Sequence, residues 1–549
     1  MATVEVDEKD ASAELELVDG AGGTRASWAL ALSGAPVRRL LGAVLVVASI
    51  GYVGWLVAGL NLAAWWLSVP FVAANGYLVV LLLVSLVNNW SRSPLRPAAP
   101  PPPTGPAPLV AVLIPTANEP PAMVERTLRS VLEQRWPHES LVVVVGDDGH
   151  RPAIAAMVGE LGREYREVAL SYVRPPDQTD PRRRGRAKDG NLNAMLALVR
   201  DRYPGVEFVE TRDADDLVGN PGFLRHTVGL LRAEPDVAYV QTIKDATVSR
   251  GDPFGNRRTF FYRGIMLSRD AAGAAFPCGS GLVWRMSALL DIGGFPSWNI
   301  VEDLYSGYLA LQRGYRGRYL PVLGALAQSA PEDLPNMSQQ LGTWALDTMR
   351  IFLWRPPWRV PGLRLRQRLH FAEMGLFYLS AVPTLALIMV PALCLLTGTH
   401  ALRVDPVRHA VVSVCYTTLV TAFTFVLGNG TPWREMTRAK QIWVGMTFTY
   451  ALAVVRALVG GPHRKPAYRI TRKNRQPGLY LGRVAPHLAA LALLLCSLAY
   501  HLARRPTLST VDYGSMFWVL FYSLVLLGFV RRSWYGLTTR GRPADVRNP

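Results

Sequence analysis

The residues with the clearest capacity for chemistry are three aspartates that closely follow an apolar run. Residues 206–209 predict a buried strand, and Asp213, Asp215 and Asp216 come shortly after it. In open α/β sheets, ligands collect at the carboxyl ends of the strands. Two carboxylates separated by one residue can both reach a hard divalent cation such as Mg²⁺ or Mn²⁺, which in turn can hold a diphosphate. The alternative is that an aspartate caps a following helix.

The elements that must position these aspartates alternate between strands and helices. Strands are predicted at residues 109–114, 141–145, 168–173, 206–209 and 237–241, and helices at residues 121–133 and 191–200. This alternation predicts an α/β nucleotide-binding layout with a mainly parallel sheet, and the aspartates would lie at one edge of it.

Long apolar segments flank this charged middle part. Residues 40–60 and 62–87 are each long enough to span about 30 Å of hydrocarbon, and together they predict a membrane hairpin. Both ends of the hairpin carry arginines, which assign that side to the cytoplasm by the positive-inside rule. They are Arg38, Arg39, Arg92 and Arg96.

Four more spans are predicted after the α/β part, which gives six in total. They cover residues 374–396, 410–427, 481–502 and 514–530. The apolar segment 442–459 is expected to be interfacial or re-entrant instead. If it crossed the membrane, a short loop rich in arginine and lysine would lie outside, against the positive-inside rule.

The expected organisation has seven parts. They are a disordered acidic segment (1–37), a transmembrane hairpin (38–90), a Pro-rich linker (91–108), a cytoplasmic α/β domain (109–340), interfacial helices (341–370), a C-terminal membrane region (371–530) and a basic cytoplasmic tail (531–549). The acidic start argues against a cleavable secretion signal.

Charge and cysteine content narrow the class of protein. The net charge is +18, and Lys and Arg cluster beside apolar runs, which indicates membrane flanks rather than a nucleic-acid surface. The four cysteines are scattered and show neither zinc-ligand spacing nor a disulfide framework.

Eight short motifs occur in one order along the chain. They are 112–120 (VLIPTANEP), 147–149 (DDG), 188–194 (KDGNLNA), 213–215 (DAD), 276–281 (FPCGSG), 301–303 (VED), 340–344 (QLGTW) and 468–473 (YRITRK). With these motifs the chain resembles, over about residues 40–530, a processive family-2 glycosyltransferase of the cellulose synthase type. The resemblance implies a GT-A type nucleotide-sugar-binding domain inserted between transmembrane helices.

The resemblance also implies a role for each motif. Nucleotide-sugar binding would involve Thr116, Asn118, Glu119, Asp147, Asp148, Lys188, Asn191 and Asp213, and Asp213 and Asp215 would bind the Mg²⁺ or Mn²⁺. The acceptor would meet Gln340, Trp344, Cys278, Gly279 and Ser280. A gating loop at 462–483, with Tyr468, Thr471 and Lys473, would close over the nucleotide sugar.

The chemistry of sugar transfer accounts for the remaining polar groups. Transfer with inversion needs a carboxylate that takes the proton of the acceptor hydroxyl. Asp303, beside Glu302, suits that role, and the alternative is an N-cap for a helix at 304–312. Lys188 would assist the cation in stabilising the leaving diphosphate. Trp344 would offer a flat face to a sugar ring, or else anchor a helix at the membrane interface.

Three residues depart from the family's motifs. Ala117 stands where the family commonly has Tyr, which reduces base stacking, and Val301 replaces a Thr. Thr343 replaces the Arg of the Gln-x-x-Arg-Trp motif and removes a guanidinium that would neutralise diphosphate charge. The last departure bears on processivity more than on catalysis.

The expected function is a membrane-embedded inverting glycosyltransferase in the cell membrane, with its catalytic domain in the cytoplasm. UDP-glucose is the donor by resemblance, a growing β-glycan the acceptor, and export of the product is expected, with export or accessory proteins as further partners. Two alternatives stay open: transfer of a single sugar to a lipid or small acceptor, and an inactive membrane scaffold or transporter. The intact carboxylates argue against the last.

Overall fold

The structure is a computed structural model, and it describes residues 34–96, 105–248, 253–300, 302–464, 476, 478–504 and 507–534. Four predicted features lie wholly or partly outside these residues. They are the acidic N-terminal segment, much of the Pro-rich linker, most of the predicted gating loop (with Tyr468, Thr471 and Lys473) and most of the basic tail. Val301 also lies outside the described residues.

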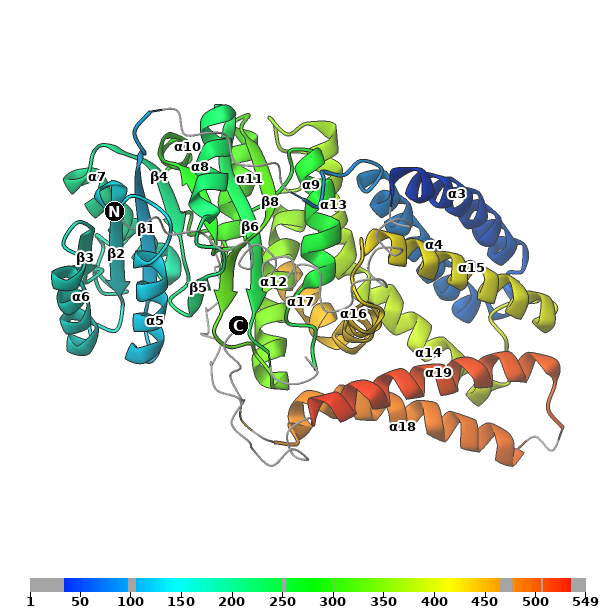
Figure 1. Cartoon of the computed structure of the whole chain (residues 1–549). Helices are drawn as coiled ribbons and strands as arrows, with labels where there is room; N and C mark the ends of the chain where they lie inside the picture. The colour runs from blue at the N-terminus through cyan, green and yellow to red at the C-terminus, as the bar shows by residue number, and fades with distance from the viewer. Residues whose placement is uncertain are drawn as a thin grey trace.

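An eight-stranded sheet forms the centre of the α/β part (Figure 1). The strands are β1 (Leu109–Thr116), β2 (Leu141–Asp147), β3 (Ala169–Val173), β4 (Val206–Thr211), β5 (Asp216–Val218), β6 (Val237–Ala246), β7 (Leu282–Arg285) and β8 (Arg316–Ala327), in the spatial order β3-β2-β1-β4-β7-β6-β8-β5. Strands β3, β2, β1 and β4 are parallel, and so are β6 and β8. Strand β7 is antiparallel to both of its neighbours, and β5 is antiparallel to β8. The predicted mainly parallel α/β sheet is confirmed.

Helices cover both faces of this sheet, because successive strand residues point to opposite faces. On one face, Val112 and Val143 share a buried apolar cluster with α5 (Pro121–Leu132), α6 (Pro152–Glu164) and α8 (Phe223–Ala233). On the other face, Leu113 and Val144 pack with α7 (Lys188–Arg202), α10 (Met286–Asp291) and α11 (Asp303–Gln312). Two apolar layers therefore enclose the sheet and leave the strand ends to carry polar groups.

The structure differs from the predicted elements around the aspartates. Strand β6 continues five residues beyond the predicted end at residue 241, and β5, β7 and β8 were not predicted. Asp216 begins strand β5, whereas α8 begins at Phe223 with Gly222 before it and no capping side chain. The alternative in which an aspartate caps a helix is therefore wrong.

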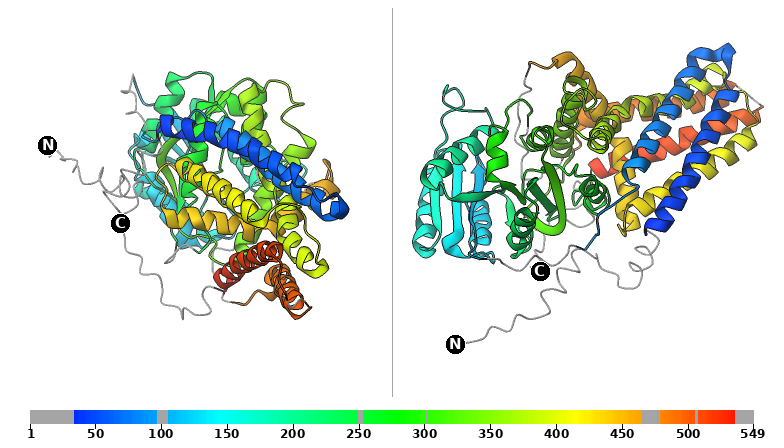
Figure 2. Two further views of the ribbon diagram at one scale, coloured as in Figure 1. Left: turned by 90° about the vertical axis from the view of Figure 1, so that its right-hand side faces the viewer. Right: turned by 90° about the horizontal axis from the view of Figure 1, so that it is seen from above.

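Six helical segments among the described residues are long and apolar enough to cross a membrane, which is the number predicted. They are α3 (Ala35–Ala58), α4 (Trp65–Asn88), α13 with α14 (Leu365–Leu379 and Ala381–Thr397), α15 (Pro406–Leu427), α18 (Leu481–Arg504) and α19 (Thr510–Ser533). They extend together from one side of the α/β part (Figure 2).

Helices α16 (Trp433–Gly445) and α17 (Thr447–Gly460) form a pair bent by 50°, which would make a seventh span if it crossed. Just before the pair, the Asn429 side chain donates to the Arg263 carbonyl (3.1 Å). Just after it, the Trp298 indole donates to the Pro462 carbonyl (3.1 Å). Both ends of the pair therefore contact the α/β part, as expected of the re-entrant segment predicted at 442–459.

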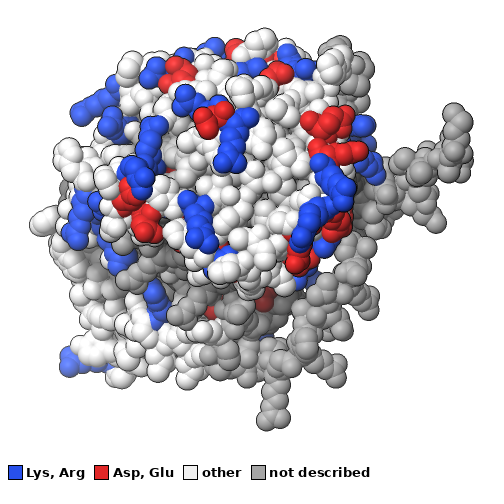
Figure 3. Space-filling view, turned by 90° about the vertical axis from the view of Figure 1, so that its left-hand side faces the viewer, with Lys and Arg blue, Asp and Glu red and all other residues white. Residues whose placement is uncertain are grey.

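Helix α12 (Leu334–Trp354) joins the α/β part to the membrane helices and packs against α17. It crosses the predicted boundary at residue 340, so Gln340 and Trp344 lie on one continuous helix. The face of the α/β part turned away from the membrane helices carries interspersed positive and negative side chains (Figure 3). Such a mixed surface is typical of a part that faces water.

Candidate active site

One cavity of about 2180 Å³ connects the strand ends of the sheet with the membrane helices. Most of the described residues predicted to act in binding or catalysis line it. They are Thr116, Asn118, Glu119, Asp148, Lys188, Asn191, Asp213, Asp215, Cys278, Gly279, Glu302, Asp303, Gln340 and Trp344. The fold thus gathers residues from almost 230 positions of sequence around a single space.

Asp213 lies at the centre of a cluster of charged groups. The Lys188 ammonium lies 2.6 Å from Asp213 Oδ1, and the Lys244 ammonium lies 2.5 Å from Asp213 Oδ2. Lys244 also lies 2.8 Å from Asp216 Oδ2. Burial would raise the pKa of the Asp213 carboxyl, but the two lysines outweigh burial and hold that pKa well below its usual range. Asp213 is therefore a carboxylate at any physiological pH.

Asp303 and Glu302 approach the same cluster from the N-terminus of α11. Lys188 Nζ lies 3.2 Å from Glu302 Oε1, so one lysine connects the aspartates with this second acidic pair. Burial, together with the charge of Glu302, raises the pKa of Asp303 to about 7. Asp303 is the first residue of α11, and its Oδ1 accepts the Leu304 amide (2.6 Å), whereas the N-cap residue Glu302 makes no side-chain capping bond. A carboxyl poised near neutrality is suited to accept a proton.

Gly279 allows these groups to come together. Its φ is +84°, a conformation that favours glycine, and its carbonyl accepts a hydrogen bond from Lys188 (3.2 Å). A Cβ at this position would lie 3.1 Å from Asp303 Oδ2 and 3.3 Å from Lys188 Nζ. The glycine of the 276–281 motif is thus required for close approach.

Two predicted binding residues lie behind the cavity wall instead of in it. Asp147 is fully buried; it accepts hydrogen bonds from the Gly149 and Arg151 amides and from the Arg151 guanidinium. Ser280 is also buried, and its hydroxyl accepts the Asp213 amide (3.1 Å). The Asp147 and Ser280 side chains support the loops that carry the residues lining the cavity. Their placement therefore does not favour direct contact with a ligand.

The end of the cavity that was predicted to bind the nucleoside consists of the β1 and β2 strand ends. Glu119 accepts the Thr116 hydroxyl (2.8 Å) and the Ala117 amide (2.9 Å), which closes the loop after β1. Asp148 is paired with Arg183 at 2.7 Å. Asn191 donates to the Gly146 carbonyl at 2.8 Å, and its buried Oδ1 accepts no hydrogen bond within the described part of the chain. That oxygen is a buried acceptor, and it faces Gly146.

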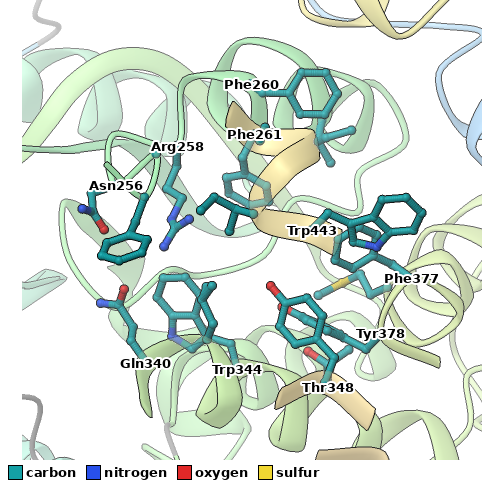
Figure 4. Close-up of a pocket in the computed structure, with 18 of the residues that line it drawn as sticks. Asn256, Arg258, Phe260, Phe261, Gln340, Trp344, Thr348, Phe377, Tyr378 and Trp443 are labelled. Atoms are coloured by element: carbon teal, nitrogen blue, oxygen red, sulfur yellow. The ribbon is translucent and has the colours of Figure 1, made fainter. Parts of the chain in front are cut away.

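The end of the cavity that was predicted to bind the acceptor contains aromatic and amide side chains from α12 and from the segment after β6. Figure 4 shows Arg258 and Trp344 directed toward one another, with Gln340 beside them. The Arg258 guanidinium carbon lies 5.4 Å from the centre of the Trp344 ring. The positive charge of Arg258 therefore lies over the Trp344 ring. The neighbouring residue, Thr343, supplies no positive charge.

Four of these functional groups were not predicted as site residues. Lys244, Arg183 and Arg258 come from an unexpected strand extension or from loops, and no spacing rule connects them with the aspartates. Asp347 on α12 is buried, and both of its carboxylate oxygens accept the Ile300 amide at 3.0 Å. It thereby holds the loop that leads to Asp303. The one signal available in the sequence for these residues was Lys244, a single lysine near the end of an apolar strand.

The side chains that could bind a divalent cation here supply only part of the ligands that it needs. Asp213 and Asp215 would supply oxygen ligands, with the remainder from a diphosphate and water, as Mg²⁺ often requires. Within the described residues, no three His, Cys, Asp or Glu side chains are arranged to hold a metal ion. Both oxygens of Asp213 already face lysines, so a cation bound there would be repelled by at least one ammonium group.

The sheet order and the polar strand ends define a GT-A-like fold next to membrane-spanning helices. A mannosyltransferase from Pyrobaculum calidifontis, solved with GDP-Man and Mn²⁺, has this fold. It is 20% identical, covers 71% of this chain and 99% of its own, and superimposes with a TM-score of 0.51. At this identity the likeness establishes the fold alone.

The comparison of sequences gives the family. Residues 106–346 match the model "Glycosyltransferase like family 2", and residues 290–460 match the model "Cellulose synthase". The chain is thus similar to family 2 glycosyltransferases over its α/β part and to cellulose synthases over the segment that follows, as the motifs implied.

Curated relatives include cellulose synthases from bacteria. Cellulose synthase 2 of Novacetimonas hansenii is 29% identical over 62% of this chain and 21% of its own length. The UDP-forming catalytic subunit of Pseudomonas fluorescens is 30% identical over 65% of this chain and 47% of its own length. The chain therefore spans less than half the length of these relatives.

Proposed function

We propose that the protein is an inverting glycosyltransferase that transfers glucose from UDP-glucose to a growing β-glycan. The catalytic part would lie at the cytoplasmic face of the cell membrane, in keeping with the arginines at the ends of the predicted hairpin. The observation that carries the proposal is the single cavity that joins Asp213, Asp303 and Trp344 to the membrane helices.

In the proposed reaction, the donor's diphosphate lies at the cluster of Asp213, Lys188 and Lys244. A divalent cation held by Asp213 and Asp215 would neutralise charge on the leaving diphosphate. Lys188, which faces both Asp213 and Glu302, supplies positive charge between the donor and Asp303. Asp303 takes the proton of the acceptor hydroxyl as that oxygen attacks the anomeric carbon.

The membrane part of the cavity supports the proposal that the product leaves between the helices. Hydroxyl side chains on one face of α15 line it, at a spacing of three or four residues. They are Ser413, Thr417, Thr421 and Thr424. Aromatic rings such as those of Tyr52 and Trp518 also line it. Hydroxyls and flat rings suit a sugar chain better than they suit lipid tails.

The test is turnover by the purified full chain in lipid nanodiscs. Radiolabelled UDP-glucose with Mn²⁺ is expected to release UDP and to yield a glycan that a β-glucanase digests. Gel sizing separates a polymer from single addition, and single-sugar products would support a lipid or small acceptor. A parallel screen of other nucleotide sugars checks the donor. No turnover with any donor would overturn the proposal and favour a scaffold.

A further inference from the structure

Asp213 has both of its carboxylate oxygens occupied by lysines of this chain. Lys188 faces Oδ1 at 2.6 Å and Lys244 faces Oδ2 at 2.5 Å. The proposed function requires the same carboxylate for a divalent cation. A cation bound to either oxygen would lie beside a lysine ammonium, and the repulsion between the two positive charges favours movement of one lysine when a nucleotide sugar and a cation bind.

The contacts of the two lysines indicate which one moves. Lys188 is held from three directions, by Asp213, by Glu302 at 3.2 Å and by the Gly279 carbonyl at 3.2 Å. Lys244 has one further ion-pair partner among the described residues, Asp216. Its side chain is 25% exposed and lines the cavity, so the ammonium has space to turn toward a ligand there. Separating Lys244 from Asp213 therefore costs less free energy than separating Lys188 from it.

Charge favours the same exchange. Four carboxylates gather here, those of Asp213, Asp215, Asp216 and Glu302, against the two lysines. A diphosphate brings further negative charge, and buried charges are tolerated only when they are paired. If Lys244 stays in the site together with a divalent cation, the site can accept the charge of the diphosphate. This requires that Lys244 and the divalent cation do not compete for Asp213.

We propose that Lys244 is a placeholder cation. It holds Asp213 while the donor site is empty, and on donor binding it leaves Asp213 free for a divalent cation and pairs with the diphosphate. The inference rests on the proposed function. Its consequence is cooperativity: the divalent cation alone binds weakly, and the nucleotide and the cation each strengthen the binding of the other by the same factor.

The experiment measures Mn²⁺ and UDP binding to the full chain in nanodiscs. Free Mn²⁺ is followed by its electron paramagnetic resonance signal, with and without UDP, and UDP binding is followed by calorimetry, with and without Mn²⁺. In the native chain, UDP is expected to tighten Mn²⁺ binding by on the order of 10-fold or more, within the range usual for coupled sites.

The informative variant is Lys244→Met, which keeps most of the side chain's length but removes its charge. It is expected to bind Mn²⁺ alone several-fold more tightly, while UDP in the presence of Mn²⁺ binds more weakly. The two affinities thus change in opposite directions, which loss of folding cannot produce. Because Asp216 would lose its cation, the double variant Lys244→Met/Asp216→Asn is made as well and is expected to show the same pair of changes.

A matched control is Lys440→Met. Lys440 lines the same cavity, but it lies on α16, where it donates to the Thr421 hydroxyl (3.2 Å). Both affinities should stay at their native values. The inference is overturned if Lys244→Met and the double variant leave Mn²⁺ affinity unchanged, or if native Mn²⁺ binding is equally tight with and without UDP. Absence of UDP binding under every condition would instead reject the proposed function.

Discussion

Asp303 is the side chain on which the proposed chemistry depends most directly. The Asp303→Asn variant should lose transfer by about 10²- to 10⁴-fold, the usual loss for one positioned acid or base. UDP affinity should change little, because Asp303 does not contact Asp213. Steady-state turnover and calorimetry with UDP measure the two effects. Asp291→Asn, at an exposed ion pair with Arg313, is the control. Turnover within a fewfold of native would remove Asp303 from the role of base.

The pKa of Asp303 also predicts a pH profile. Burial raises this pKa to about 7, and a general base acts only when it is deprotonated. The value of kcat/KM should therefore rise as pH increases through about 7 and level off above it, with a tenfold fall per pH unit well below 7. Rates measured from pH 5.5 to 8.5 test this expectation. A flat profile over that range would mean that another group takes the proton.

At the scale of elements, α12 carries Trp344, the proposed acceptor platform, and positions Asp303, the proposed base. Its Asp347 holds the loop before Asp303 through the Ile300 amide. The Asp347→Ala variant should lower kcat on the order of 10²-fold, since a displacement of about 1 Å can cost that much. The KM for the donor should change less. Asp347→Asn keeps one acceptor oxygen and should recover most of the rate; equal losses in both variants would argue against positioning through this bond.

The segment after β6 supplies the cation that α12 lacks. Arg258 covers Trp344, whereas Thr343, the neighbour of Trp344, has no charge. We expect Arg258→Ala to weaken UDP binding several-fold and to shorten the product. Thr343→Arg introduced into the Arg258→Ala variant should restore part of the UDP affinity and part of the product length, because a guanidinium returns to the same end of the cavity. Calorimetry and gel sizing report the outcome. If the double variant is worse than Arg258→Ala, the site does not use a cation there.

At the scale of the whole molecule, contacts with the α/β part determine the topology of the membrane region. The Gln476 amide donates to Asp333, the N-cap residue of α12, at 3.1 Å. Gln476 therefore lies on the side of the α/β part. A cysteine at Gln476, in a chain without its four native cysteines, should resist an impermeant thiol reagent in intact cells and react after permeabilisation.

Thr507→Cys serves as the control for this topology. Thr507 lies in the turn between α18 and α19, at the opposite end of the membrane helices, and it is exposed. It should react in intact cells. Labelling of the cysteine at 476 from outside would mean that α16 and α17 together cross the membrane, which would make seven spans.

Sequence patterns alone predicted the elements whose residues interact over short distances. Short apolar runs predicted the parallel strands β1 to β4, and apolar runs of about 20 residues predicted the six spans, because burial in a sheet or in lipid imposes those patterns locally. Motifs predicted that Asp213, Asp303 and Trp344 share one site; in the structure Asp213 follows strand β4, Asp303 begins α11 and Trp344 lies within α12.

Only the tertiary structure decided which groups act on those residues. Lys244 and Arg258 reach the site through a strand extension and a loop, and Asp347 reaches the loop before Asp303 across more than 40 residues. Strands β5, β7 and β8 are short or pair antiparallel with distant partners, so their pairing has no local signal. Asp147 and Ser280 match binding motifs, yet they face inward, because the direction of a side chain depends on the packing of its neighbours. Charge pairing and packing act through space, and sequence spacing does not record them.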